Sequence, residues 1–225
     1  DRYELLAQVR LCRAEADEEL QKVVPLDVPV ARCDICFRLV SRMLFASGGD
    51  TRKTPFHAVL VHGLVRDDMG RKMSKSLGNG IDPLEMIEKY GCDALRMNMV
   101  TGNSPGNDMR FYVERCEAMR NFANKLWNAS RYVLMNLGED AKNCLPAQDA
   151  LTIADKWVLS KLNRLIAEVT ENLEKYELGA AVPKVYDFLW DTYCDWYSEL
   201  TKASLYSEDA GQEQTALQVL VYVLD

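Results

Sequence analysis

The sequence predicts a mainly α-helical protein with a small α/β segment, and three observations support this prediction. Long amphipathic stripes follow one another from about Phe111 onward, which is typical of an antiparallel helical bundle. A short β-branched run over 57–65 is bounded by turn residues and favours a buried strand. The following stretch, 66–80, is polar and rich in glycine and has no hydrophobic period, so we expect a loop.

Two helices are expected before the predicted strand. In 1–24, apolar residues recur every three to four positions, which indicates one amphipathic helix. Pro25 and Pro29 then interrupt the pattern. The apolar run 35–46 predicts a second helix that ends at Ser47-Gly48-Gly49-Asp50.

A further helix is expected to start after the loop. Asp82 can cap it, Pro83 suits its first position, and Glu85 adds a carboxylate to its first turn. Gly91 is suited to the position just past its end.

Four apolar stripes at helical spacing predict the bundle. They run over 119–137, over 158–176, over 185–203 and from about Ala216 onward. The last stripe stops in mid-pattern at Asp225, so we expect the bundle to be truncated. We find no internal repeat.

Composition excludes several classes of protein. The chain has 225 residues, of which 48% are hydrophobic and 27% charged, as expected of a globular chain. No stretch approaches the ~20 apolar residues that span a bilayer, so we expect no membrane association. Seven scattered cysteines fit a reducing cytoplasm, and we expect a monomer. The net charge is −7, so any RNA contact must come from local basic clusters.

A protein-bound metal is not expected. His57 and His62 are the only two histidines, too few for a multi-histidine site. Cys33 and Cys36 form a CxxC pair, which could bind zinc or cycle as a disulfide. Zinc would need a second pair, and a redox motif would need a βαβ unit, which the sequence does not predict.

The loop residues between Gly70 and Asn79 suggest phosphate chemistry. Arg71, Lys72 and Lys75 supply positive charge, and the serine hydroxyls and backbone amides supply hydrogen bonds. Such a loop suits a polyphosphate, although a solvated basic loop is the alternative. Asp67 and Asp68 beside the loop are expected to shape it rather than to hold Mg²⁺.

Lys72-Met73-Ser74-Lys75-Ser76 reads KMSKS, the signature of class I aminoacyl-tRNA synthetases, and its surroundings resemble the valyl-tRNA synthetase family. The resemblance covers roughly 26–225. The segments that carry it are His62–Asp67, Gly70–Arg71, Ile81–Pro83, Lys89–Arg96, Arg120–Arg131 and Tyr193–Tyr197.

The resemblance implies an ATP-dependent ligase that takes ATP with Mg²⁺, valine and valine tRNA. It implies that Lys75 and Lys72 are catalytic and that Met73, Ser74 and Ser76 complete an ATP-binding loop. Residues 1–108 would be the end of the catalytic core, with the KMSKS loop, a stem-contact region and an unassigned helix over 1–24. Residues 109–225 would be a truncated helical anticodon-binding domain.

Basic residues are predicted to line one helix at the start of that domain: Arg110, Arg115, Arg120, Lys125 and Arg131. Of these, Arg120 and Lys125 are the candidate tRNA contacts, against the alternative of a solvated helix face. Phe122 and Trp127 could stack on unpaired bases, but their place on or beside the apolar stripe favours the core.

Departures from the family favour a second hypothesis. The HIGH-type half of the ATP site and an editing domain are absent, so we expect the chain alone to be inactive. Arg38 and Leu39 stand where the family usually has a Phe-Trp pair that shapes the amino-acid pocket, so this chain is not expected to recognise valine unaided. A non-catalytic tRNA-binding or scaffold module derived from a synthetase is therefore the alternative.

Overall fold

The computed structural model describes residues 26–50, 52–137, 145–207 and 209–225. The chain forms two compact units. The first draws its described residues from Asp1–Asn79 and Ser104–Phe111, and the second comprises Gly80–Asn103 and Tyr112–Asp225. The stem-contact region predicted within 1–108 thus falls largely in the second unit. The helix predicted over 1–24 lies outside the described residues.

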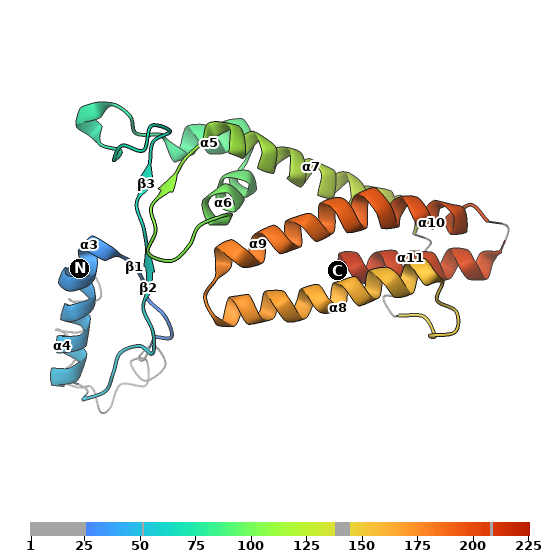
Figure 1. Cartoon of the computed structure of the whole chain (residues 1–225), viewed down its shortest axis with the longest axis horizontal. Helices are drawn as coiled ribbons and strands as arrows, with labels where there is room; N and C mark the ends of the chain where they lie inside the picture. Colours follow the sequence, from blue (N-terminus) through green and yellow to red (C-terminus); the bar gives the residue numbers. More distant parts are fainter. Residues whose placement is uncertain (1–25, 51, 138–144, 208) are drawn as a thin grey trace. The chain divides into compact units, whose positions relative to one another are not determined.

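A βαβ arrangement organises the first unit (Figure 1). Strand β1 (Val30–Arg32) pairs in parallel with β2 (Leu60–His62), with Ala31 opposite Val61. The connection contains α3 (Cys33–Ile35), a π-helical segment η2 (Cys36–Val40) and α4 (Ser41–Asp50). The expectation that the CxxC pair lacks a βαβ unit is therefore wrong, because Cys33 directly follows β1.

Two further expectations for this unit need correction. The helical run starts at Cys33, two residues before the predicted start, and ends at Asp50, within the predicted stop at Ser47-Gly48-Gly49-Asp50. The single buried strand expected over 57–65 is instead two short strands, β2 and β3 (Val65–Arg66), whose side chains are half-buried or exposed. Strand β3 pairs in parallel with β4 (Met109–Arg110), which places Arg110 in a strand and not on the predicted helix.

The core of the first unit is small. Ala31, Val40 and Phe56 are buried together, and Leu26, Cys36, Met43 and Val59 pack against them. Gly63 allows a close approach of two backbones, since a Cβ there would lie 2.0 Å from the Asn107 carbonyl oxygen.

The second unit begins with the helix predicted after the loop. In α5 (Pro83–Tyr90), the Asp82 side chain accepts a hydrogen bond from the Leu84 amide, and Gly91 follows with φ 94°. Both the predicted start and the predicted end are confirmed. Helix α6 (Cys92–Val100) comes next.

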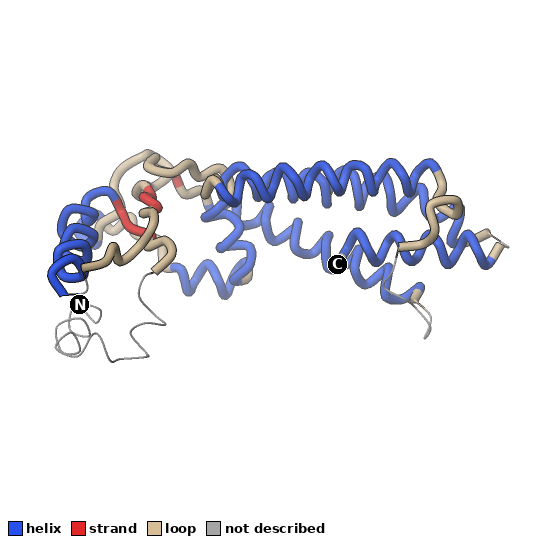
Figure 2. The backbone as a smooth tube through the Cα atoms, turned by 90° about the horizontal axis from the view of Figure 1, so that it is seen from below, coloured by secondary structure: helices blue, strands red, loops and turns tan. Residues whose placement is uncertain are grey.

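Long helices form the rest of the second unit and lie side by side, with most loops at their ends (Figure 2). They are α7 (Val113–Asn136), α8 (Ile153–Glu174), α9 (Leu178–Asp187), the π-helical η4 (Phe188–Tyr197), α10 (Ser198–Leu205) and α11 (Ala210–Leu224). Their fully buried side chains include Val158, Tyr193, Tyr197, Val219 and Leu220. The helical prediction is confirmed, and each of the four stripes falls on these helices.

Candidate functional site

The KMSKS segment lies in a loop that follows β3 in the first unit. A tight turn opens this loop, in which the Gly70 amide donates to the Asp67 carbonyl at 2.9 Å. Gly70 has φ 79° and Gly78 has φ 61°, which a residue with a Cβ rarely adopts. The two glycines therefore bracket the loop because its backbone requires left-handed conformations at both ends.

The buried carboxylate of Asp67 holds the first half of the loop. It accepts hydrogen bonds from the Arg71 amide at 2.6 Å, from Arg71 Nε at 2.8 Å and from Asn79 Nδ2 at 2.9 Å. The structure confirms that Asp67 shapes the loop. Asp68 bonds only to the neighbouring Met69 amide in the described part of the chain.

The carboxamide of Asn79 links the end of the loop to its middle. Its Oδ1 accepts a hydrogen bond from the Ser74 amide at 3.0 Å, and its Nδ2 also donates to the Lys72 carbonyl oxygen at 3.3 Å. One side chain therefore fixes the backbone on both sides of Met73. Sequence analysis missed Asn79; its place between Gly78 and Gly80, next to a motif of charged and hydroxyl residues, was the available signal.

Electrostatics favour the ionised form of the carboxylates that hold the loop. The hydrogen bond from Asn79 lowers the pKa of Asp67 below its usual value, and the Arg71 amide and guanidinium lower it further. The Leu64 amide, followed by Arg66, lowers the pKa of Asp108 in the same way. Arg66 Nε and Nη2 each lie 2.6 Å from Asp108 Oδ2, and this pair joins β3 to the segment before β4.

The predicted ATP-binding residues lie along this framework. Lys72 is exposed, Met73 and Ser74 are half-buried, and Lys75 begins the short 3₁₀ turn η3 (Lys75–Leu77). The Ser74 and Ser76 hydroxyls lie 3.2 Å apart, and Ser74 Oγ also accepts from the Leu77 amide at 3.3 Å. The arrangement presents an exposed ammonium and hydroxyl groups on a backbone that is already fixed, which is suited to binding a polyphosphate.

The candidate tRNA contacts on α7 have partners within the second unit. Lys125 Nζ lies 2.5 Å from Asp195 Oδ1 and 3.8 Å from the centre of the Trp190 ring. Arg120 lies over the Tyr90 ring at 5.9 Å and 3.9 Å from Glu117. Their role in RNA binding stays a prediction, and these contacts reduce the positive charge that either residue offers to a phosphate.

The two aromatic residues of α7 that were considered for base stacking differ in environment. Phe122 is buried and packs against Tyr186, with ring centres 4.5 Å apart and ring planes tilted by 32°. Trp127 is 71% exposed, so the expectation that it belongs to the core is wrong. The reason is the helical period: Trp127 lies five residues after Phe122 and therefore faces away from the buried side.

The described residues also bear on metal binding, on the cysteines and on membrane-spanning helices. In the described residues, no three His, Cys, Asp or Glu side chains gather where they could hold a metal ion. Cys33, Cys36, Cys92, Cys116 and Cys194 are free thiols. Within the same part of the chain, no helix is both long and apolar enough to cross a membrane.

Two family models match the chain. The family described as class I tRNA synthetases (I, L, M and V) matches residues 6–112, and the anticodon-binding domain of tRNA ligases matches residues 155–225. The first match reaches back into the segment 1–24 that the sequence left unassigned.

Curated relatives support the same assignment. A valine–tRNA ligase of Clostridium tetani is 54% identical over 207 residues, and one of Carboxydothermus hydrogenoformans is 53% identical over 207 residues. Each alignment covers 92% of this chain, but only 24% and 23% of the relative. The chain thus spans about a quarter of the length of the relatives that it matches.

Solved structures agree on the fold. A LeuRS of Agrobacterium radiobacter K84, in a complex with tRNA and LeuAMS, has a TM-score of 0.68 at 22% identity, covering 92% of this chain and 27% of that one. A methionyl-tRNA synthetase of Mycobacterium tuberculosis with methionyl-adenylate has a TM-score of 0.71 at 23% identity, covering 94% and 42%. The chain belongs to the class I tRNA synthetases, with an anticodon-binding region over residues 155–225.

Proposed function

We propose that this chain is part of a valine–tRNA ligase, to which it contributes the KMSKS loop for ATP-dependent activation of valine and a helical region for binding tRNA. The observation that carries the proposal is the KMSKS backbone itself, which Asp67 and Asn79 fix from both sides. Identity of about half to valine–tRNA ligases over nearly the whole chain supports the amino acid and the tRNA named here.

In the proposed reaction, the carboxylate of valine attacks the α-phosphorus of ATP. A new phosphorus–oxygen bond forms, and the bond to pyrophosphate breaks. Negative charge grows on the leaving phosphates, so Lys72 and Lys75 stabilise the transition state more than the ground state. Ser74 and Ser76 donate to phosphate or hold the loop, and Mg²⁺ arrives with ATP as part of the substrate.

The loop is suited to this role because its backbone is fixed while a basic side chain stays exposed. The fixed part is the backbone at Arg71, Lys72 and Ser74, whereas the Lys72 side chain is exposed. A backbone set in advance lowers the cost of placing a charge beside the leaving group. Because the HIGH-type half is absent from this sequence, we expect activation to require the rest of the ligase.

The direct test transfers the loop into a complete enzyme. Residues 26–225 replace the matching segment of the Clostridium tetani valine–tRNA ligase, and valine-dependent pyrophosphate exchange is measured. We expect an active chimera, in which Lys75→Ala or Lys72→Ala lowers the exchange rate by roughly 10²-fold while valine binding stays nearly unchanged. Lys175→Ala, at the exposed C-cap of α8, is the control. An unchanged rate in Lys75→Ala would contradict the assigned role.

The RNA half of the proposal is tested with the chain itself. We expect binding to valine tRNA that exceeds binding to the same tRNA with an altered anticodon, and a preference that persists at physiological salt. We further propose that the protein acts in the cytoplasm as a monomer, which light scattering would check. Equal binding to both tRNAs would contradict recognition of the anticodon by this chain.

A further inference from the structure

The CxxC pair, Cys33 and Cys36, lies in the setting that a redox motif requires. Strand β1 ends at Arg32, and Cys33 starts the helical connection to the parallel strand β2. Two cysteines three positions apart in a βαβ unit are typical of a dithiol that cycles with a disulfide. Neither thiol belongs to the KMSKS loop, so their chemistry does not rest on the proposed function.

The two thiols differ in their access to solvent. Both are free, but Cys33 is exposed, whereas Cys36 is half-buried and packs against the core of Ala31, Val40 and Phe56. A reagent of low molecular weight reaches an exposed thiol more readily than a half-buried one. Cys33 is therefore suited to the first reaction with an oxidant, and Cys36 to the second reaction, which closes the disulfide.

The backbone between the two cysteines is compatible with a bond between them. Residues three positions apart on a helix have Cβ atoms about 5–6 Å apart, whereas a disulfide requires about 3.5–4.5 Å. The helical run is irregular at this point, because α3 gives way to the π-helical η2 and Ile35 has φ −103° and ψ −9°. A local adjustment at Ile35 can therefore bring the two sulfur atoms together without breaking a continuous α-helix.

The other described cysteines are single. Cys92, Cys116 and Cys194 lie on α6, α7 and η4, respectively. Cys116 is buried and its sulfur accepts a hydrogen bond from Asn98 Nδ2 at 3.1 Å, whereas Cys92 is exposed. Cys92 is therefore the exposed single thiol with which Cys33 can be compared.

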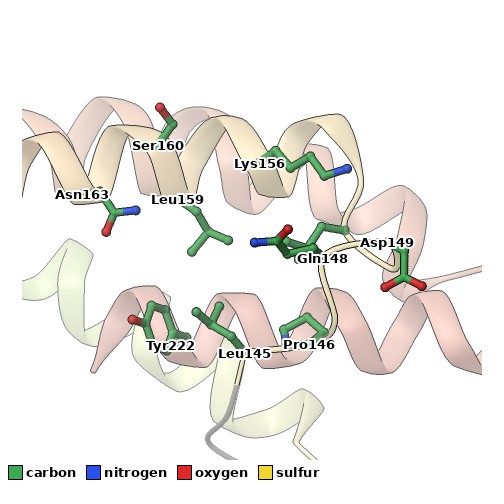
Figure 3. A pocket seen from close by; sticks show the side chains of 10 residues that line it. Leu145, Pro146, Gln148, Asp149, Lys156, Leu159, Ser160, Asn163 and Tyr222 are labelled. Carbon is green, nitrogen blue, oxygen red and sulfur yellow. The ribbon is translucent and has the colours of Figure 1, made fainter.

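A pocket of about 820 Å³ in the second unit supplies no further thiol. Figure 3 shows Leu159 and Asn163 directed from α8 toward Tyr222 of α11, with Gln148 close to them. Among the described residues that line this pocket, none is a cysteine or a histidine. The pocket therefore offers no sulfur chemistry that would compete with the CxxC pair.

Asp34, which lies between the two cysteines, connects the pair with the KMSKS loop. Its carboxylate accepts hydrogen bonds from the Arg32 guanidinium, and this contact lowers the pKa of Asp34. The positive charge of Lys72 lowers this pKa further, so the two side chains attract one another. Lys72 also forms a β-bridge with Arg66 of β3. A covalent bond that spans Asp34 should therefore alter the surroundings of Lys72.

We propose that Cys33 and Cys36 form a redox-active dithiol, which reacts with disulfides of low molecular weight to give an intramolecular disulfide beside the KMSKS loop. The Cys33 thiolate attacks one sulfur of the reagent RSSR, so a Cys33–SR bond forms and one thiolate RS⁻ leaves. The Cys36 thiolate then attacks the Cys33 sulfur, which forms the Cys33–Cys36 bond and releases the second RS⁻. The pair loses two electrons, the reagent gains them, and the two protein protons end on two molecules of RSH. Excess thiol reverses both steps.

The test treats the parent chain with oxidised glutathione and maps its cysteines by mass spectrometry. Trypsin cleaves after Arg32 and Arg38, so one peptide, Cys33–Arg38, contains both thiols. We expect this peptide to lose about 2 Da, the mass of two hydrogens, and to regain it after treatment with dithiothreitol.

Cys92 provides the comparison within the same sample. As an exposed single thiol it should carry a glutathione adduct rather than an intramolecular disulfide. Because Cys36 is held close to Cys33, their disulfide should be half formed at roughly tenfold less oxidised glutathione than the adduct at Cys92.

Single variants test the order of attack. Cys36→Ser should stop at a glutathione adduct on Cys33, and Cys33→Ser should slow the modification of Cys36 by about tenfold, because Cys36 is half-buried. Cys92→Ser is the matched control and should leave the Cys33–Cys36 disulfide unchanged. Circular dichroism checks that each variant retains its helices.

NMR of the backbone amides tests the connection to the loop. Oxidation of the parent chain should shift the amide resonance of Lys72, and the shift should be absent in the double variant Cys33→Ser, Cys36→Ser under the same treatment. An unchanged Lys72 resonance in the oxidised parent chain would contradict the connection through Asp34.

The mass measurements can overturn the redox pair itself. A Cys33–Arg38 peptide that stays reduced, or that keeps a glutathione adduct on Cys33 without closing, would show that the pair is not a redox dithiol. A cross-link from Cys33 or Cys36 to Cys12 or Cys144, which lie outside the described residues, would contradict the pairing. None of these results involves ATP or tRNA, so the proposed function would stand in each case.

Discussion

The KMSKS loop and the helical bundle are held by different kinds of interaction. The loop depends on one buried carboxylate and one carboxamide, those of Asp67 and Asn79, and its Leu77 is 62% exposed. The bundle depends on side chains that are removed from water, such as Val158, Val219 and Leu220. A loop fixed by a few hydrogen bonds, each contributing about 1 kcal/mol net, can open without disturbing a core. Such a loop is suited to closing on a substrate and releasing it.

One buried polar pair links two segments of the bundle. The Tyr197 hydroxyl donates to Asp155 Oδ1 at 2.6 Å, and Asp155 also completes a capping box with Thr152 at the start of α8. Burial raises the pKa of Tyr197 above its usual value, and the bond to Asp155 raises it further. This buried pair fastens the start of α8 to the end of η4.

The largest expected effect comes from the bundle core. Leu220→Ala should lower the free energy of unfolding of the helical signal by about 2–5 kcal/mol, because it leaves a cavity at a fully buried position. The control, Leu173→Ala, alters a residue that is 47% exposed and should cost less than about 1 kcal/mol. Thermal and urea unfolding give both values. Similar losses in the two variants would show that the buried core does not stabilise the bundle more than its exposed side chains do.

A close approach in the second unit should give the next largest effect. A Cβ on Gly179, at the start of α9, would lie 1.9 Å from the Asn103 carbonyl oxygen. Gly179→Ala should therefore destabilise the chain by about 1–3 kcal/mol. Gly211→Ala, in the first turn of α11, is the matched variant, since a Cβ there would meet only Asp209 Oδ1 at 3.2 Å. Equal stability of the two variants would show that α9 does not rely on this approach.

A smaller effect of opposite sign is expected at the end of α8. Tyr176 has φ 60°, and the Glu177 amide donates to the Asn172 carbonyl oxygen at 2.8 Å, as in a Schellman motif. Tyr176→Gly should stabilise the helical unit by up to about 1 kcal/mol, because glycine adopts this conformation without strain. Tyr176→Ala should bring no comparable gain. A loss of stability in the glycine variant would mean that the tyrosine ring contributes more than its backbone costs.

The smallest expected effect on global stability is acid loosening of the loop. The pKa of Asp67 is lower in the folded chain than in the unfolded chain, so its stabilisation is complete above the unfolded value of about 3.9 and is lost as pH falls through the folded value. Exchange of the Arg71 amide, corrected for its intrinsic rate, should stay constant from pH 7 to about pH 5 and rise in more acidic solution. In Asp67→Asn this pH dependence should disappear. If the pH dependence persists in Asp67→Asn, it arises from another titrating group.

The sequence predicted the elements that local chemistry specifies. The cap at Asp82, the glycine after α5 and the helical stripes of the bundle each depend on residues within one or two turns. The βαβ unit was not predicted, because β1 and β2 have three residues each and are defined by their pairing. Trp127 was misplaced because a stripe locates a helix face only to within about one residue.

The sequence motif of the candidate site could be predicted, but the hydrogen bonds that fix its backbone could not. KMSKS names the candidate side chains, whereas the bond between Asn79 and Asp67 joins residues twelve positions apart in an aperiodic loop.

The most direct test of the account is amide hydrogen exchange at Ser74 in the parent chain and in Asn79→Ala. The Ser74 amide donates to the Asn79 carboxamide, so the variant should lose protection at Ser74 while the unfolding temperature of the helical signal stays the same. This result would show that the loop is ordered by its own polar bonds. Unchanged protection at Ser74, or an equal loss throughout the bundle, would contradict the separation between loop and core on which the account rests.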